Sequence, residues 1–184
     1  MMMNLSLRKK FPNRKEASFT LVELLVVISI IGLLAGMGFP AINGALKAGK
    51  KAEVAAMAES IKTAINAFYA EYSYYPTNAS GNACTNSDGT FLGMMTASSN
   101  NLANPRGISF LEVPPKFTNK NLGLVTPPGF YAKGAQSNFS IAINVSGTGT
   151  MTNRVGSKNY TNSASVVVWV SDPSDATKPV GTFK

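Results

Sequence analysis

An apolar run from Phe19 to Ile42 contains one charged side chain, Glu23, and this run limits what the chain can fold into. As a helix rising about 1.5 Å per residue, its 24 residues reach roughly 36 Å, which is long enough to cross a bilayer. A carboxylate inside a membrane costs on the order of 2.5–3.5 kcal/mol, so a plain anchor has no use for one. We therefore expect Glu23 to pair with a positive charge at the same membrane depth on another copy of the chain.

A short basic leader, residues 1–18, precedes the apolar run. It carries one acid, Glu16, and five of the 17 basic side chains of the protein, namely Arg8, Lys9, Lys10, Arg14 and Lys15. By the positive-inside rule, these charges place the leader on the cytoplasmic side of the membrane. Without the leader, 12 of the 17 basic and 8 of the 9 acidic side chains remain, which gives a net charge of +4. The net charge of +8 of the whole chain is therefore a poor argument for nucleic-acid binding.

The chain has no histidine and a single cysteine, Cys84. The missing histidine excludes Ser-His-Asp and Cys-His catalytic triads and every zinc site that needs an imidazole ligand. One thiol cannot form a disulfide within its own chain, although pairing between two copies stays open. Since no other catalytic arrangement is visible, we expect a protein that is not an enzyme.

Helix-weakening residues gather in the second half of the apolar run, where Gly32, Gly36 and Gly38 precede Pro40. Proline removes one intrahelical hydrogen bond and clashes with the preceding turn, and each glycine costs up to about 1 kcal/mol of helix stability. Two interpretations follow from this pattern. The segment is either a kink or close helix contact, or a stretch that unwinds when subunits pack together.

The fourteen residues from Lys15 to Ile28, KEASFTLVELLVVI, resemble the N-terminus of a type IV prepilin or a type II secretion pseudopilin. The resemblance implies that a prepilin peptidase cleaves between Ser18 and Phe19 on the cytoplasmic face and methylates the new amine of Phe19. It also implies that Glu23 directs subunit assembly and that Gly32 and Pro40 are helix-breaking positions. The family usually has glycine before the cleaved bond, where this chain has Ser18.

Cleavage before Phe19 also makes physical sense. It creates an α-amine whose ordinary pKa of about 7.7–8 leaves it largely protonated at neutral pH, and methylation keeps that charge. Glu23 of a neighbouring subunit can then neutralise the amine in a low-dielectric environment. Before cleavage this amine does not exist, so the leader disfavours premature assembly.

The segment from Ala45 to about Tyr72 predicts an amphipathic helix. Its apolar side chains recur at spacings of three and four residues, and they are Val54, Met57, Ile61, Ile65, Phe68 and Tyr72. Tyr75-Pro76 ends the pattern, because a proline disfavours helix in the residue before it. We expect this helix, assigned to residues 43–75, to pack one face on a globular head. The segment from Ala48 to Thr77, which ends in a tyrosine-rich turn, resembles the corresponding region of the pseudopilins.

We expect residues 76–184 to form the head, and the whole chain an α+β pilin fold with a long N-terminal helix packed on a small antiparallel sheet. Residues 76–106 predict a long loop with one short helix, and their apolar islands are Phe91-Leu92 and Met94-Met95. Alternation over 139–145 predicts a half-buried strand, and residues 150–155 are expected to pair back on it as a hairpin. The β-branched run 165–170 predicts a central strand.

Major pseudopilins often bind calcium in an acidic loop, and this resemblance draws attention to Asp172 and Asp175. The region from Val113 to Ser171 has no Asp or Glu, and calcium needs six to eight oxygen ligands. A capped turn explains the two aspartates equally well, so we expect no metal or cofactor beyond, at most, a weak calcium site there.

The region from Val113 to Ser171 also carries scattered cations and has no set of aromatic side chains on which bases could stack. This pattern indicates a solvated surface rather than a nucleic-acid site, and its cations are Lys116, Lys120, Lys133, Arg154 and Lys158.

We therefore expect a single-pass inner-membrane protein with its head in the periplasm, which is cleaved, N-methylated and polymerised into a periplasmic pseudopilus for type II-like secretion. Its expected partners are other copies of the chain, the prepilin peptidase and an inner-membrane assembly platform. One alternative is a subunit of a surface type IV pilus for adhesion, motility or DNA uptake. Another is a membrane-anchored binding protein or enzyme that never polymerises.

Overall fold

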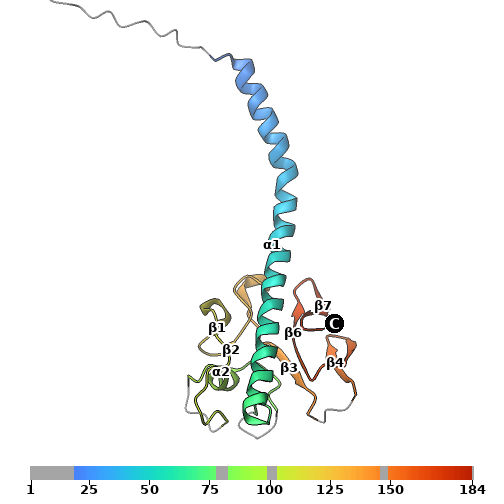
Figure 1. The fold of residues 1–184 in the computed structure, drawn as a ribbon. Coiled ribbons are helices and arrows are strands. Elements are labelled where there is room, and N and C mark those ends of the chain that lie inside the picture. The colour runs from blue at the N-terminus through green and yellow to red at the C-terminus, as the bar shows by residue number, and fades with distance from the viewer. Residues whose placement is uncertain (1–18, 78–82, 99–102, 146–148, 184) are drawn as a thin grey trace, which may run out of the picture. The chain divides into compact units, whose positions relative to one another are not determined.

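The computed structural model describes residues 19–77, 83–98, 103–145 and 149–183, apart from the side chains of residues 38–41. The chain divides into two compact units, Met1–Asn43 and Gly44–Lys184. The helix α1, Leu21–Tyr72, runs from the first unit into the second, and it is the first element of the second unit. Figure 1 colours these elements along the chain.

In the first unit, the described residues of α1 expose apolar side chains along their length. The helix contains a stretch that is long and apolar enough to span a membrane. It continues through Gly32 and Pro40, and a Cβ added to Gly32 would contact nothing within 4 Å. The single chain is thus helical at both positions, and a break there stays a prediction about the assembled filament.

In the second unit, α1 contributes the apolar stripe that the sequence predicts. Val54, Ile61, Ile65 and Phe68 are fully buried, since residues three and four apart lie on one face of a helix. The ring of Phe68 contacts those of Tyr72, Tyr74 and Phe110 at centroid distances of 4.7, 5.6 and 5.3 Å. The helix ends at Tyr72, three residues before the end expected at residue 75.

The expected short helix is α2, Gly89–Met95. Asp88 caps it, because its carboxylate accepts a hydrogen bond from the backbone N–H of Phe91 at 2.9 Å. Phe91 and Met94 of α2 are fully buried against the same core as α1. Short elements follow in chain order: η1 Pro115–Phe117, β1 Thr118–Asn119, β2 Gly123–Leu124 and η2 Ala132–Gly134, with β1 and β2 antiparallel.

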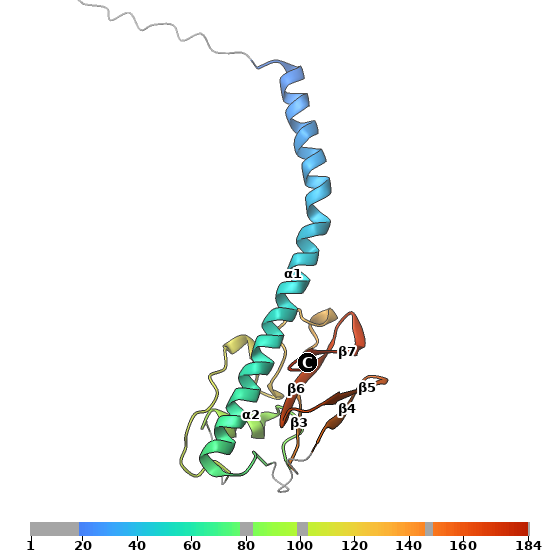
Figure 2. The same ribbon diagram turned by 45° about the vertical axis from the view of Figure 1, so that its right-hand side comes forward.

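The main sheet has the order β3-β6-β7, with β3 at Ser140–Ile143, β6 at Val166–Asp172 and β7 at Asp175–Gly181. Both pairings are antiparallel, so the predicted central strand is confirmed as β6. Alternate residues of β6 pack in two different hydrophobic cores, one on each face of the sheet. Val166, Val168 and Val170 pack in the α1 core, while Val167 and Trp169 pack on the opposite face. The α+β architecture follows from this stacking of helix and sheet (Figure 2).

The expected hairpin between 139–145 and 150–155 is wrong. The strand β4, Met151–Val155, pairs instead with β5, Lys158–Asn162, in register from Val155↔Lys158 to Met151↔Asn162. The connecting residues are Gly156 and Ser157, and Gly156 has φ +58°, as a tight two-residue hairpin turn requires. The new hairpin covers the outer face of the sheet through Val155, Met151 and Tyr160.

Candidate functional site

The start of α1 holds Glu23 in a reciprocal set of hydrogen bonds with Thr20. The backbone N–H and the hydroxyl of Thr20 both donate to Oε2 of Glu23, at 2.9 and 2.7 Å. The backbone N–H of Glu23 donates to Oγ1 of Thr20 at 3.2 Å. This is a capping box, in which a threonine before the helix and a glutamate three residues later satisfy donors that the helix start leaves open.

The capping box aims the carboxylate of Glu23 toward the beginning of the helix. Phe19, the residue before Thr20, is 76% exposed there. Glu23 has no cation partner among the described residues. Ser29, a polar residue farther along the apolar run, is satisfied by donating to the carbonyl of Leu25 at 2.7 Å. The arrangement can therefore accept a cation that another chain provides. Ser18, on the other side of the expected cleaved bond, lies outside the described residues.

The loop from Asp172 to Thr177 consists of two capped turns. Oδ1 of Asp172 accepts from the backbone N–H and hydroxyl of Ser174, at 2.8 and 2.6 Å. Oδ1 of Asp175 accepts in the same way from Thr177, at 3.0 and 2.6 Å. The remaining oxygens face lysines, with Lys51 Nζ 2.7 Å from Asp172 Oδ2 and Lys178 Nζ 3.2 Å from Asp175 Oδ2.

These contacts give the two aspartates a local structural role and tie α1 to the β6–β7 turn. Within the described ranges, no group of three or more His, Cys, Asp or Glu side chains stands ready to hold a metal ion. The expectation that the chain needs no metal or cofactor stays a prediction, and a calcium titration followed by thermal melting tests it.

The hydrogen bonds from Thr177 and the neighbouring Lys178 lower the pKa of Asp175 to about 2. Burial would raise the pKa of Asp172, but the bonds from Lys51 and Ser174 outweigh it and lower that pKa as well. A carboxyl whose pKa is lower in the folded state than its ordinary value of about 3.9 adds stability above that value. This contribution is lost as the pH falls toward the folded pKa.

We therefore expect Asp175→Asn to flatten the pH dependence of stability between about pH 4 and pH 2. Urea unfolding of the detergent-solubilised chain, followed by the fluorescence of Trp169, measures it. Glu112→Gln is the matched control, because Glu112 is exposed and has no ion pair among the described residues, yet loses the same charge. An Asp175→Asn profile as steep as that of the unchanged chain would contradict the assigned role.

Cys84 is buried in the main core, with 4% of its surface exposed. Burial, followed by the nearby charge of Asp88, raises the pKa of its thiol to about 11. The side chain therefore stays protonated at neutral pH and behaves as an apolar core residue. A disulfide between copies would require the head to open around it.

The cations of the acid-free region do not form one cluster. Lys116 pairs with Glu53 of α1. Lys120 and Lys133 lie on other elements, in the β1–β2 connection and in η2. Arg154 and Lys158 share the β4–β5 hairpin, where Arg154 is paired in register with Asn159. The scatter agrees with a solvated basic surface.

Residues 13–39 match the family described as the prokaryotic N-terminal methylation motif. The chain is 33% identical over 66 residues to a fimbrial protein of Neisseria meningitidis serogroup A, a match that covers 36% of this chain and 39% of the relative. It is also 33% identical over 66 residues to the type IV major pilin protein PilE1 of Neisseria gonorrhoeae, covering 36% of this chain and 31% of the relative. A fimbrial protein EcpC of Eikenella corrodens is 29% identical over 84 residues, covering 45% and 55%.

The chain thus spans about a third to a half of the length of these curated relatives. No solved structure matches it. Both the matched motif and the residues of the capping box fall in the same N-terminal region.

Proposed function

We propose that this type IV prepilin-like protein is a structural subunit that is cleaved before Phe19, methylated at the new amine and polymerised into a helical filament. The proposal starts from the prepilin motif and the pilin-type relatives, and from a fold with a long helix and a small antiparallel sheet. In this role the chain is a building block with no catalytic step of its own.

The observation that carries the proposal is the position of Glu23. Its carboxylate sits at the start of an exposed apolar helix and lacks a cation among the described residues, although its hydrogen bonds to Thr20 are complete. Moving an unpaired charge into lipid is costly, and a cation on a neighbouring subunit offsets that cost. The amine of a cleaved Phe19 is such a cation.

Each step of assembly then has a residue that performs it. The basic leader holds the precursor with its N-terminus in the cytoplasm. The peptidase removes the leader and exposes the amine of Phe19. Glu23 of a subunit already in the filament accepts that amine, which fixes how far one subunit is staggered along its neighbour. Apolar side chains of the membrane-spanning part of α1 then pack against each other instead of against lipid.

Cleavage tests the first step. When the chain is expressed with a prepilin peptidase, we expect its mass to fall by residues 1–18 plus one added methyl group, and its sequence to begin at Phe19. Ser18→Gly is expected to be cleaved at least as fast, because glycine offers the peptidase the least side-chain bulk. Intact-mass spectrometry and N-terminal sequencing measure both, with a catalytically inactive peptidase as control. Functional filaments that still begin at Met1, or cleavage after Ala35 or Ala41, would refute the proposal.

Two kinds of filament suit such a subunit. We favour a periplasmic pseudopilus of a type II-like secretion system, with the head in the periplasm, because residues 48–77 resemble the corresponding region of pseudopilins. A surface type IV pilus is the second candidate, and the printed names of the relatives, fimbrial protein and type IV major pilin, favour it. Deletion of the gene separates the two: loss of a secreted protein supports the pseudopilus, and loss of surface fibres supports the pilus.

A further inference from the structure

Three lysines without a carboxylate partner among the described residues gather at the start of the second unit. Lys47 and Lys50 lie three residues apart on α1, which places both on one side of the helix. Lys133 belongs to η2, and all three side chains are exposed. The neighbouring Lys51, by contrast, is neutralised by Asp172 at 2.7 Å. The positive charge of this end is therefore carried by the three exposed lysines.

Contacts within the unit hold η2 close to this part of α1. Nζ of Lys50 donates to the carbonyl of Gly129 at 2.9 Å, four residues before Lys133. The acceptor is neutral, so the bond leaves the charge of Lys50 in place. The hydroxyl of Tyr131 donates to the carbonyl of Ser171 at 2.7 Å, at the end of β6 that an ion pair ties to α1. Figures 1 and 2 both show the tan segment with η2 beside α1, where that helix enters the unit.

The length of chain between Lys47 and the apolar run is short. The run ends at Ile42, five residues earlier, and α1 is helical throughout. Five residues rise about 7.5 Å along a helix, and they reach no more than about 18 Å when fully extended. The headgroup layer adds roughly 5–8 Å to each side of the hydrocarbon core. With the apolar run in a membrane, Lys47 is thus within reach of the lipid headgroups, whatever the angle between the two units.

Two further features distinguish this end from an ordinary solvated surface. Leu46, in the same turn as Lys47, is 59% exposed, and an apolar side chain among lysines is typical of helices that lie at a membrane interface. Lys133 has φ +56°, a backbone region in which glycine is preferred. Other residues held in this region are enriched at binding and active sites. The ammonium of Lys133 has no hydrogen bond within the described residues, so local bonds do not explain this backbone conformation.

The ligand chemistry that fits these groups is the phosphate diester of an anionic phospholipid. A surface of such lipids favours a nearby lysine by about fivefold in affinity, and the attraction falls off within a Debye length of about 8–10 Å. An ammonium binds phosphate as a point charge, so three flexible lysines need no fixed geometry. A free phosphate offers no apolar region to Leu46, whereas a bilayer offers one at the same height. The membrane is therefore the source of phosphate that the position favours.

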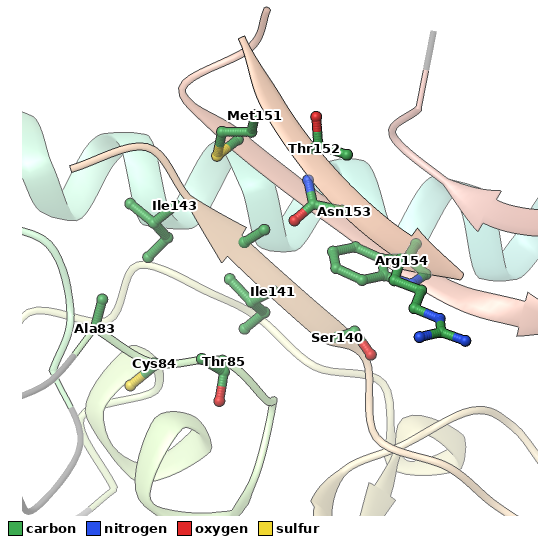
Figure 3. A pocket seen from close by; sticks show the side chains of 12 residues that line it. Ala83, Cys84, Thr85, Ser140, Ile141, Ile143, Met151, Thr152, Asn153 and Arg154 are labelled. Atoms are coloured by element: carbon green, nitrogen blue, oxygen red, sulfur yellow. The ribbon is translucent and has the colours of Figure 1, made fainter. Parts of the chain in front are cut away.

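Two other cations without a carboxylate partner lie on the β4–β5 hairpin and provide a comparison. Figure 3 shows Arg154 at a groove between β3 and β4, where it is the one charged residue of the lining. Its Nε donates to the carbonyl of Gly156 at 3.0 Å. Lys158 is exposed on the same hairpin. This pair carries the same charge as Lys47 and Lys133, but it is far from the apolar run in sequence.

We propose that the end of the head formed by Lys47, Lys50 and Lys133 binds anionic phospholipid headgroups, with Leu46 entering the boundary of the acyl chains. This contact rests on the membrane anchoring that the proposed function includes. It holds the head against the bilayer while the subunit waits in the membrane. A subunit that enters a filament breaks the contact, so the lipid composition influences how readily subunits leave the membrane.

The full chain in nanodiscs tests the contact. Ala135→Cys places a fluorophore directly after η2, because Ala135 is exposed and native Cys84 is buried. Nitroxides on the lipid headgroups quench this fluorophore when it approaches them. We expect at least about threefold stronger quenching in discs with one-third phosphatidylglycerol than in discs of phosphatidylcholine alone. Ala70→Cys, exposed on α1 and about 35 Å along the helix from Lys47, is the control label and is expected to show no difference.

Charge removal shows whether the lysines cause the difference. Lys47→Gln combined with Lys133→Gln, in the Ala135→Cys chain, is expected to abolish the stronger quenching in phosphatidylglycerol discs. Lys50 is kept, because its bond to Gly129 supports the loop. Arg154→Gln combined with Lys158→Gln removes the same charge and is expected to leave the difference in place. Salt at 1 M, where the Debye length is about 3 Å, is expected to abolish the difference in the chain with unchanged lysines.

Several outcomes would overturn the lipid contact. Equal quenching in the two kinds of disc would do so, and it would leave an acidic protein as the partner of the lysines. Equal losses for the two double variants would also do so, because the net charge of the head would then cause the effect. A chain that stays in the membrane under alkaline carbonate but shows no lipid dependence refutes the contact alone. A chain that carbonate extracts from the membrane refutes the anchoring in the proposed function as well.

Discussion

Glu23→Gln is expected to reduce incorporation into filaments by about 100-fold or more, while cleavage before Phe19 continues at its normal rate. Glutamine can still complete the capping box with Thr20, so the start of α1 keeps its structure. In the proposed function, what is lost is the negative charge that would neutralise the amine of the next subunit. Removing one partner of a buried ion pair costs about 3–5 kcal/mol, because the other charge stays buried alone.

Sheared filaments, quantified against membrane-retained subunit by immunoblot, measure this loss. Ser29→Ala is the matched control, since Ser29 lies in the same apolar run and bonds only within its own helix. The control is expected to assemble normally. Wild-type levels of filament with Glu23→Gln would show that the carboxylate does not pair with the amine, and the assembly role of Glu23 would have to be abandoned.

Phe68→Ala is expected to lower the free energy of unfolding of the head by about 3–5 kcal/mol, the range measured for large aromatic residues in protein cores. Phe68 has no exposed surface and joins α1 to the loop around Phe110 by a ring contact of 5.3 Å. Alanine leaves a cavity at the point where both segments meet. A loss of this size is a large fraction of the 5–15 kcal/mol by which such domains are stable.

Urea unfolding followed by Trp169 fluorescence reports this change, because Trp169 is the one tryptophan and lies on the sheet. Tyr69→Ala, one residue along the helix, is the control. Tyr69 is 44% exposed, and we expect its loss to cost less than about 1 kcal/mol. Equal losses for the two variants would contradict the position of Phe68 at the centre of the core.

The elements that the sequence predicts correctly are those that bury a continuous apolar surface. The stripe of α1 from Val54 to Phe68 follows the helical repeat and is buried as expected, while Tyr72 at its end is partly buried. The run around Val168 is β-branched and apolar on both faces, and β6 has a core on each side. In both elements, burial of a continuous apolar surface decides the structure, and hydrophobic periodicity reports that burial directly.

The strands that the sequence does not reveal are polar or interrupted. In β5, four polar residues surround Tyr160, so no alternation appears. In β7, Pro179 argues against a strand, yet proline is tolerated there because β7 is an edge of the sheet. The wrong hairpin between 139–145 and 150–155 has a recognisable cause. Gly156-Ser157 is a two-residue turn that signals pairing between the short runs on either side of it, and the prediction did not use this signal.

At the N-terminal site, the sequence identifies Glu23 as an unusual charge but leaves its bonds to Thr20 unseen. A threonine followed three residues later by a glutamate is a capping-box pattern, and this signal was available in the sequence. The ion pair of Asp172 with Lys51 is different. It joins the β6–β7 turn to α1, so it depends on how the sheet packs on the helix, and this packing does not follow from local pattern.

The capping box has a consequence for subunits that are not part of a fibre. The bonds between Thr20 and Glu23 need no second chain, so a protomer released by disassembly would regain them in the bilayer without help. The carboxylate of Glu23 would then alternate between hydrogen bonds to Thr20 alone and an added ion pair with the amine of another subunit. A reservoir of idle protomers would remain usable through repeated rounds of growth and shrinkage.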